Sequence, residues 1–255
     1  MGRELLTGRT VDTNSAWIAA RLTDVGAVVR RIVAVDDEPA VIAPEIVGAR
    51  TRGAALVITT GGLGPTLDDR TLAGVAAAFG RRLAEHPAAL AFVARRYAEL
   101  AAAGAVAGAG LTPPRRKMAS LPEGAEPIDN AVGTAPGVLL ADDVLALVAL
   151  PGVPAEMRAV FEAALPRILA RLGATGHVAE REIASGSGDE SVLTVAVARV
   201  MEALPGVYLK SLATAFSPGC DLRVRISARS SSAAAAEALV AQAADRLAAE
   251  LAPPR

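Results

Sequence analysis

The stretch Thr59-Thr60-Gly61-Gly62-Leu63-Gly64-Pro65-Thr66-Leu67-Asp68-Asp69-Arg70-Thr71 decides the fold of this 255-residue chain. A short apolar run at residues 54–58 precedes it, and this length predicts a buried parallel strand rather than a helix. After it, apolar residues recur at helical spacing from Leu72 to Gly80. The stretch is therefore a strand-to-helix turn, which is where α/β proteins bind ligands.

The residues of this turn favour an anion. Gly61, Gly62 and Gly64 let the backbone adopt positive φ and approach a ligand closely, and free amides at a helix start suit a phosphate. Asp68 and Asp69 would repel that phosphate unless a cation or a proton lies between them, which indicates a metal site or a general base. The alternative is that the carboxylates only cap the helix and the glycines only make the turn.

The order Gly-Gly-Leu-Gly-Pro-Thr-x-Asp-Asp-x-Thr is narrower than a generic glycine-rich loop, and it resembles the signature of CinA-type proteins. The resemblance extends through most of residues 2–170, and it rests on Gly2-Arg3-Glu4-Leu5-Leu6, Asp12-Thr13-Asn14, Asp37, Asn130-x-x-Gly133-Thr134-Ala135-Pro136-Gly137 and Leu150-Pro151-Gly152-Val153-Pro154-x-Glu156. It implies an α/β fold: a MoCF-like (molybdopterin-binding) three-layer domain with a mainly parallel sheet at 1–172, then a small α+β domain at 177–255. The nicotinamide-nucleotide deamidase domain of full-length CinA proteins has no counterpart here.

The resemblance also implies a set of site residues. The candidate catalytic carboxylates are Asp37, Asp68 and Asp69, and the last two are also the candidate metal ligands. The candidate phosphate- and ligand-binding residues are Gly61, Gly62, Gly64, Thr66, Glu4, Asp12, Asn14, Lys117, Gly133, Thr134, Pro151, Gly152 and Glu156. Simpler alternatives stand beside several of them: a helix cap for Asp12 or Asn14, a solvated basic turn for Lys117, and helix-dipole complementation for Glu156.

Two functions compete. The first is a pyrophosphatase that uses a divalent metal such as Mg²⁺ to hydrolyse ADP-ribose or a similar dinucleotide, an activity that the resemblance implies. The second is a binding or transfer module for molybdopterin, in which the glycines hold the pterin phosphate. We favour the first because Leu63-Gly64-Pro65-Thr66 resembles the loop sequence of CinA-type proteins. Under either hypothesis the partner is a small nucleotide or pterin ligand, and we expect a homo-oligomer.

Composition narrows the class of protein further. The net charge of −1 gives no indication of nucleic-acid binding, and no apolar run is long enough for a membrane span. The single cysteine, Cys220, excludes an intramolecular disulfide and is expected to be a small core residue of a strand. We therefore expect a cytoplasmic protein without membrane or nucleic-acid partners.

The first residues raise a question about the sheet. Residues 28–35 alternate as a strand and end in Asp36-Asp37, and a helix over 38–52 should connect them to the next strand. The chain, however, enters the family pattern at the glycine that should follow a first strand. We expect either further residues upstream of Met1 or an open slot in the sheet. The first is favoured, because a lost buried strand exposes apolar surface on its neighbours.

Overall fold

The computed structural model describes residues 1–173, 176–212 and 221–252, and it divides the chain into two compact units. The first comprises Met1–Ile18 and Arg30–Ala174, and the second comprises Ala19–Val29 and Thr175–Arg255. The sequence pattern placed the division between 172 and 177 and did not indicate that residues 19–29 group with the second unit. The predicted core position of Cys220 lies outside the described residues.

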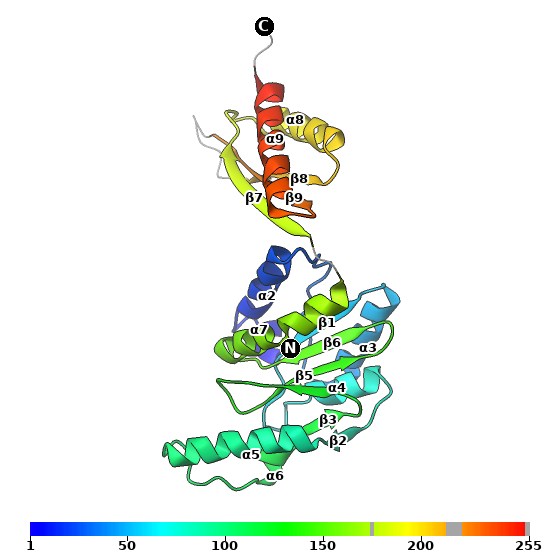
Figure 1. The fold of residues 1–255 in the computed structure, drawn as a ribbon, viewed down its shortest axis with the longest axis vertical. Helices are drawn as coiled ribbons and strands as arrows, with labels where there is room; N and C mark the ends of the chain where they lie inside the picture. Colours follow the sequence, from blue (N-terminus) through cyan, green and yellow to red (C-terminus); the bar gives the residue numbers. More distant parts are fainter. Residues whose placement is uncertain (174–175, 213–220, 253–255) are drawn as a thin grey trace. The chain divides into compact units, whose positions relative to one another are not determined.

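The first unit is an α/β domain (Figure 1). Its elements, in chain order, are α1 (Arg3–Leu6), α2 (Thr13–Asp24), α3 (Pro39–Thr51), β1 (Leu56–Thr60), α4 (Thr71–Ala78), β2 (Leu83–Glu85), α5 (Pro87–Ala102), α6 (Pro113–Lys117), β3 (Ser120–Pro122), β4 (Glu126–Ile128), β5 (Gly137–Ala141), β6 (Ala146–Leu150) and α7 (Pro154–Leu172). The end of α2 falls in the second unit. The predicted strand-to-helix turn after β1 is confirmed.

The main sheet has the order β1-β6-β5-β4. β1 and β6 are parallel, with Leu56 opposite Ala146 and Thr60 opposite Leu150. The β6–β5 and β5–β4 pairs are antiparallel, so the described strands form a mixed sheet. Because β1 and β6 run in the same direction, the loops that follow them leave the sheet at the same edge.

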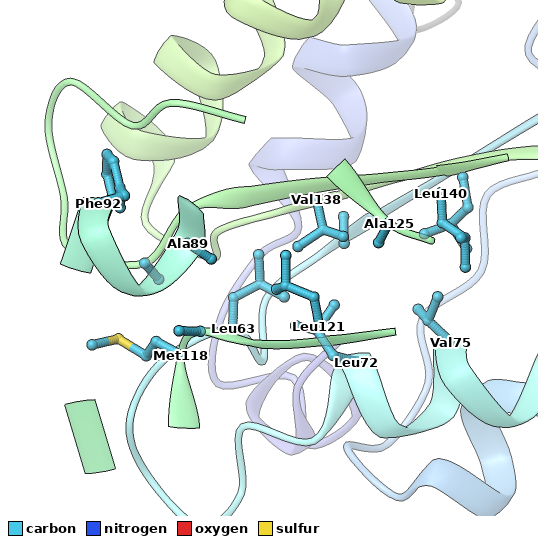
Figure 2. Packing of buried hydrophobic residues seen from close by; sticks show 14 of the residues in the cluster. Leu63, Leu72, Val75, Ala89, Phe92, Met118, Leu121, Ala125, Val138 and Leu140 are labelled. Atoms are coloured by element: carbon cyan, nitrogen blue, oxygen red, sulfur yellow. The ribbon is translucent and has the colours of Figure 1, made fainter. Parts of the chain in front are cut away.

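Helices cover both faces of this sheet, which gives three layers. All of β6 is buried, and alternate residues of a strand face opposite sides. Leu147 and Ala149 join the cluster that includes side chains of α3 and α4. Figure 2 shows part of this cluster, including Leu72 and Val75 of α4 and Val138 and Leu140 of β5. Helix α7 packs on β6 from outside that cluster, and its Val160 lies against Gly137. At about 1.5–3 kcal/mol for each fully buried large aliphatic side chain, this core dominates the stability of the unit.

A polar anchor fixes the β5–β6 turn to the helical layer. The Asp142 carboxylate accepts hydrogen bonds from the Leu145 and Val144 amides, each at 2.9 Å, and pairs with the Arg50 guanidinium at 2.6 Å. The bond from the Leu145 amide is the largest single cause of an Asp142 pKa lowered to about 2, and Arg50 adds to it. The turn is therefore held by an ionised carboxylate.

The strand predicted at residues 28–35 is wrong, because these residues form no strand. The segment has no regular secondary structure, and Val28, Ile32 and Val33 are exposed by 58%, 56% and 40%. Gly2 donates its amide to Val35 O at 3.2 Å, whereas the Met1 ammonium donates to Thr60 O at 2.7 Å. Met1 and Gly2 thus connect the carboxyl end of this segment to the carboxyl end of β1. Among the described residues, no strand pairs with β1 on the side opposite β6.

The second unit is α+β, as expected. It contains β7 (His177–Ala184), α8 (Glu190–Ala203), β8 (Val207–Leu212), β9 (Arg223–Ser230) and α9 (Ala233–Leu251), and its antiparallel sheet has the order β7-β9-β8. Val224, Ile226 and Ala228 of β9 are buried with residues of α8 and α9. Across both units, none of the helices in the described ranges has the length and apolar character that a membrane span requires.

Candidate functional site

The Gly61-Gly62 turn is fixed by backbone conformation and by Thr71. Gly61 and Gly62 have φ of 93° and 68°, a region that side chains with a Cβ disfavour. Thr71 Oγ1 donates to Gly61 O at 2.8 Å, and the Thr71 amide donates to Gly62 O at 3.2 Å. A Cβ on Gly62 would overlap the Thr71 hydroxyl. The turn therefore requires glycine, but the first amide of α4 is already used and is not free for a ligand.

Asp69 closes the second half of the loop. One of its carboxylate oxygens, Oδ2, accepts from the Thr66 amide at 2.9 Å and from the Thr66 hydroxyl at 2.6 Å. Helix α4 begins at Thr71 with Arg70 as its N-cap residue and without a side-chain cap. Asp69 therefore orders the loop before the helix rather than capping it. Asp68 and Leu67 lie exposed beside it, with Leu67 exposed by 89%.

Lys117 approaches the same loop from α6. Its ammonium donates to Asp69 O at 2.6 Å, to Gly64 O at 3.4 Å and to Thr66 O. Burial lowers the pKa of this ammonium below its ordinary value, and the Asp69 and Asp68 carboxylates act against that shift. The neighbouring Arg116 instead pairs with Glu85 at 2.7 Å. The two adjacent cations thus have different partners, and Lys117 is the one that contacts the glycine-rich loop.

The N-terminal carboxylates gather around Met1. Burial lowers the pKa of the Met1 ammonium, and Asp12, Asp37 and Glu4 oppose this effect through their negative charge. Asp37 accepts from the Arg3 amide at 3.3 Å, and burial raises its pKa. The charges of Asp37, Asp12 and Glu4 thus act on the Met1 ammonium, which lies at the carboxyl end of β1.

Gly61 also lies against the turn that follows β6. The Gly61 amide donates to Leu150 O at 3.0 Å, and a Cβ on Gly152 would lie 3.3 Å from the Gly61 Cα. Asn14 Nδ2 donates to Gly152 O at 2.8 Å, whereas Asn14 Oδ1 is a buried atom without a hydrogen-bond partner in the described structure. Asn14 is therefore not a helix cap; Asp12 has that role, since it accepts from the Ser15 amide at 2.9 Å.

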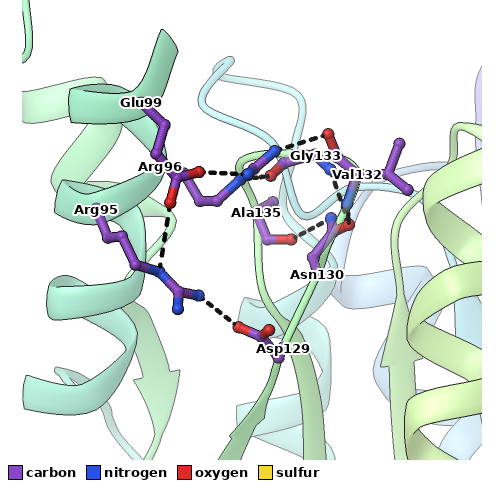
Figure 3. A network of polar contacts seen from close by, with 8 residues as sticks. All are labelled: Arg95, Arg96, Glu99, Asp129, Asn130, Val132, Gly133 and Ala135. Carbon is purple, nitrogen blue, oxygen red and sulfur yellow. Dashed lines mark hydrogen bonds and ion pairs between the residues drawn. The ribbon is translucent and has the colours of Figure 1, made fainter. Parts of the chain in front are cut away.

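The loop between β4 and β5 is held by Asn130 (Figure 3). This fully buried side chain accepts from the amides of Val132 and Gly133 at 3.1 and 2.8 Å, and donates to Ala135 O at 2.8 Å. It also donates to Glu156 Oε2 at 2.8 Å. The Glu156 carboxylate is therefore an acceptor within the loop network as well as an acidic residue in the first turn of α7.

Arg96 of α5 holds this loop from its outer side. Its guanidinium donates to Gly133 O at 2.8 Å and to Val132 O at 3.0 Å, and pairs with Glu99 (Figure 3). A Cβ on Gly133 would overlap the Glu156 carboxylate, so glycine is required here by packing. Thr134 contacts Met118 through its hydroxyl at 4.0 Å, next to Lys117.

Most of the predicted site residues belong to three connected loops, whereas Glu4, Asp12, Asn14, Asp37 and Lys117 lie outside them. These loops comprise residues 61–69, 130–136 and 151–156. They are joined by the Gly61–Gly152 approach, by the Glu156–Asn130 bond, and by Lys117 at the end of α6 together with the following Met118. Pro151 is buried at the start of the third loop. The sequence prediction missed Thr71, Asn130 and Arg96 as residues that shape these loops. Thr71 and Asn130 stand inside the motifs quoted above, but nothing in the sequence links Arg96 to Gly133.

The acidic side chains limit what kind of metal site the protein can form. Across residues 1–173, 176–212 and 221–252, no three or more His, Cys, Asp or Glu residues are arranged to hold a metal ion. Mg²⁺ is commonly held by one or two carboxylates together with substrate phosphates and water. Asp68 and Asp69 could hold Mg²⁺ in this way, together with substrate phosphates and water. The described residues do not include the three or more ligands that a metal site made only of protein side chains would need.

Comparisons with known proteins agree with this architecture. Residues 1–170 match the family model described as "Probable molybdopterin binding domain". A curated protein of Aeropyrum pernix is 47% identical over 94% of this chain and 88% of its own length. One of Pyrobaculum aerophilum is 41% identical over 97% and 90%, respectively. The crystal structure titled "protein CinA with unknown function from Thermoplasma acidophilum" is 41% identical, with a TM-score of 0.60, over 66% of this chain and 94% of that one.

Proposed function

Because this chain belongs to the family described as a probable molybdopterin binding domain and has a CinA-type N-terminal unit, we propose that its three loops bind a phosphate-bearing small molecule and hydrolyse the pyrophosphate bond of ADP-ribose or a similar dinucleotide. The observation that carries the proposal is the approach of the Gly61 and Gly152 backbones, where two chain turns meet at the carboxyl edge of the parallel pair β1–β6. Backbone without side chains is what a phosphate needs for close contact.

The carboxylates support hydrolysis over passive binding. Asp68 and Asp69 are on the same loop as the glycines, and negative side chains beside a phosphate are tolerated when a cation is shared between them. When bound there, Mg²⁺ would supply charge neutralisation of the pyrophosphate and polarise the phosphorus centre. Asp69 would remain oriented by Thr66, and Asp37, whose pKa is raised by burial, is suited to holding a proton near the reacting group.

The test is direct. The full chain is incubated with ADP-ribose in the presence of Mg²⁺ or EDTA, and AMP and ribose 5-phosphate are separated chromatographically. The proposal expects both products in equal amounts with Mg²⁺ and neither with EDTA. Intact ADP-ribose at high protein concentration with Mg²⁺, Mn²⁺ and Co²⁺ would contradict hydrolysis.

The second candidate is molybdopterin binding without hydrolysis. The description of the matched family model favours it, since that description names a pterin rather than a nucleotide. Equilibrium binding of molybdopterin and of ADP-ribose, measured on one preparation, separates the two. A pterin that binds tightly while ADP-ribose neither binds nor reacts would select the second candidate.

A further inference from the structure

Lys117 uses its charge in an uncommon way. An ammonium has three N–H donors, and here they face three backbone carbonyls, those of Gly64, Thr66 and Asp69. These three residues span the part of the glycine-rich loop between the Gly61-Gly62 turn and α4. The loop is therefore folded around the ammonium.

The contact has a directional consequence. A peptide unit points its C=O and N–H in opposite directions, so the Thr66 and Asp69 carbonyls that face the ammonium leave the amides of Leu67 and Arg70 pointing away from it. Gly64 is followed by Pro65, which has no N–H. The Thr66 amide belongs to a different peptide unit, and it donates to the Asp69 carboxylate at 2.9 Å. Lys117 and Asp69 thus both restrain residues 64–69, and the hydrogen bonds of the ammonium and of the carboxylate are both charge-assisted.

The lysine itself is firmly placed. Met118 and Ala119, which follow it, are 2% and 0% exposed and belong to the main core, so the backbone at Lys117 cannot shift without disturbing that core. With its donors committed to carbonyls, the ammonium would have to give up loop contacts before it could grip a phosphate. This argues against the direct phosphate clamp expected from the sequence.

We propose that Lys117 is the positioning residue of the 64–69 loop, and that it holds this loop in the conformation that receives the phosphate without contacting the ligand. The second half of this statement rests on the function proposed above. The first half concerns the free protein alone.

The experiment compares Lys117→Met with Arg116→Met. Both variants remove one positive charge from adjacent positions of α6, but Arg116 pairs with Glu85 and not with the loop. Hydrogen exchange of amides 62–70 is measured without ligand, and calorimetry gives the affinities for ADP-ribose and for inorganic pyrophosphate. We expect Lys117→Met to raise exchange in this loop and the dissociation constants by about tenfold or more, and Arg116→Met to change each less than about twofold.

Each outcome decides the proposal. Unchanged loop exchange in Lys117→Met overturns it, and weaker binding with unchanged exchange would identify Lys117 as a ligand contact instead. Faster exchange with unchanged affinity would separate loop order from binding and overturn the second half. If the wild-type chain binds neither probe, the proposed function fails, while the exchange comparison still decides the role of Lys117.

A second variant covers the case in which Lys117→Met does not fold. In Lys117→Ala, added ethylammonium can occupy the vacated position and donate to the three carbonyls, whereas tetramethylammonium carries the same charge without an N–H donor. Restored loop protection and affinity with ethylammonium alone supports positioning through hydrogen bonds. Equal effects of both cations, or no effect of either, contradict it.

Discussion

Met1 and Gly2 lie between Thr60 of β1 and Val35, where one parallel strand of the first unit would end, and completing that strand should stabilise the unit. Successive residues of a strand send their amides to opposite sides. Met1 bonds Thr60 and Gly2 bonds Val35 in this alternating way, so these two residues already occupy the last rungs of such a strand. The perturbation is a five-residue valine- and isoleucine-rich extension placed directly before Met1, because a strand with helices on both faces requires apolar side chains throughout.

The gain can be worked out from the bonds and the buried area. Five added residues would make up to about ten backbone hydrogen bonds at about 1 kcal/mol each, which their ordering cost of about 1–2 kcal/mol per residue largely cancels. The remainder is apolar burial, about 1.5–3 kcal/mol for each of two or three side chains. The extension also replaces the desolvated Met1 ammonium by a neutral amide. A net gain of about 3 kcal/mol raises the melting temperature by about 6–12 °C in a unit of this size.

Calorimetry and hydrogen exchange check this prediction. The control is a glycine- and serine-rich extension of equal length, which adds the same amide but cannot bury apolar surface. The apolar extension should raise the melting temperature and slow exchange across residues 28–36, and the control should do neither to a comparable degree. Equal melting temperatures for the two extensions, or unprotected amides at 28–36 in the apolar form, would refute the reasoning.

Three further predictions concern single residues. Gly62→Val should weaken ADP-ribose binding by about tenfold or more. Gly53→Val is the control, because it imposes the same positive-φ strain where no neighbouring atom obstructs the side chain, and it should leave binding unchanged. Equal calorimetric affinities for the two variants would show that the glycine turn does not bind the ligand. Asp69→Asn keeps an oxygen that accepts from Thr66, so the fold should survive while hydrolysis falls by about 10²; undiminished turnover would make Asp69 purely structural. The pKa of Asp142 is about 2 in the folded chain, below its unfolded value of 3.8, so the ionised carboxylate contributes about 2 kcal/mol to the free energy of unfolding. This contribution is complete above pH 3.8 and is lost as the pH falls through 2. Chemical denaturation should therefore show that Asp142→Asn is less stable than the wild type at pH 7, by an amount that shrinks toward pH 2.

Local patterns were sufficient for most of the fold. The glycine-rich turn, the apolar run before it and the helical spacing after it predicted β1 and α4, because each of these signals acts within a few residues. The prediction of a strand at residues 28–35 was wrong because strand formation also depends on distant parts of the chain. Alternation gives a segment the capacity to pair, but a strand also needs a neighbour at hydrogen-bonding distance, which the pattern of one segment cannot supply.

The motifs indicated which residues to consider at the site but not their contacts. Gly61, Gly152 and Glu156, predicted as ligand-binding residues, lie on connected loops, and their binding of a ligand stays a prediction. The motifs could not show that Lys117 binds carbonyls or that Arg96 holds the 130–136 loop, since both contacts join residues more than 30 positions apart. Long-range hydrogen bonds depend on the packed elements that carry the donors, and those become known only with the fold.

Because the chain has few lysines, covalent labelling of lysine can report on the glycine-rich loop. Among 26 basic side chains, the chain has two lysines, Lys117 and Lys210. Lys210 is exposed on β8, whereas Lys117 is partly buried with its nitrogen enclosed by carbonyls. An acylating reagent should therefore label Lys210 first, and the labelling rate at Lys117 measures how often the loop opens. Acylation of Lys117 would also remove its charge and two of its three N–H donors. A single acyl group would therefore prevent the opened loop from returning to its folded conformation.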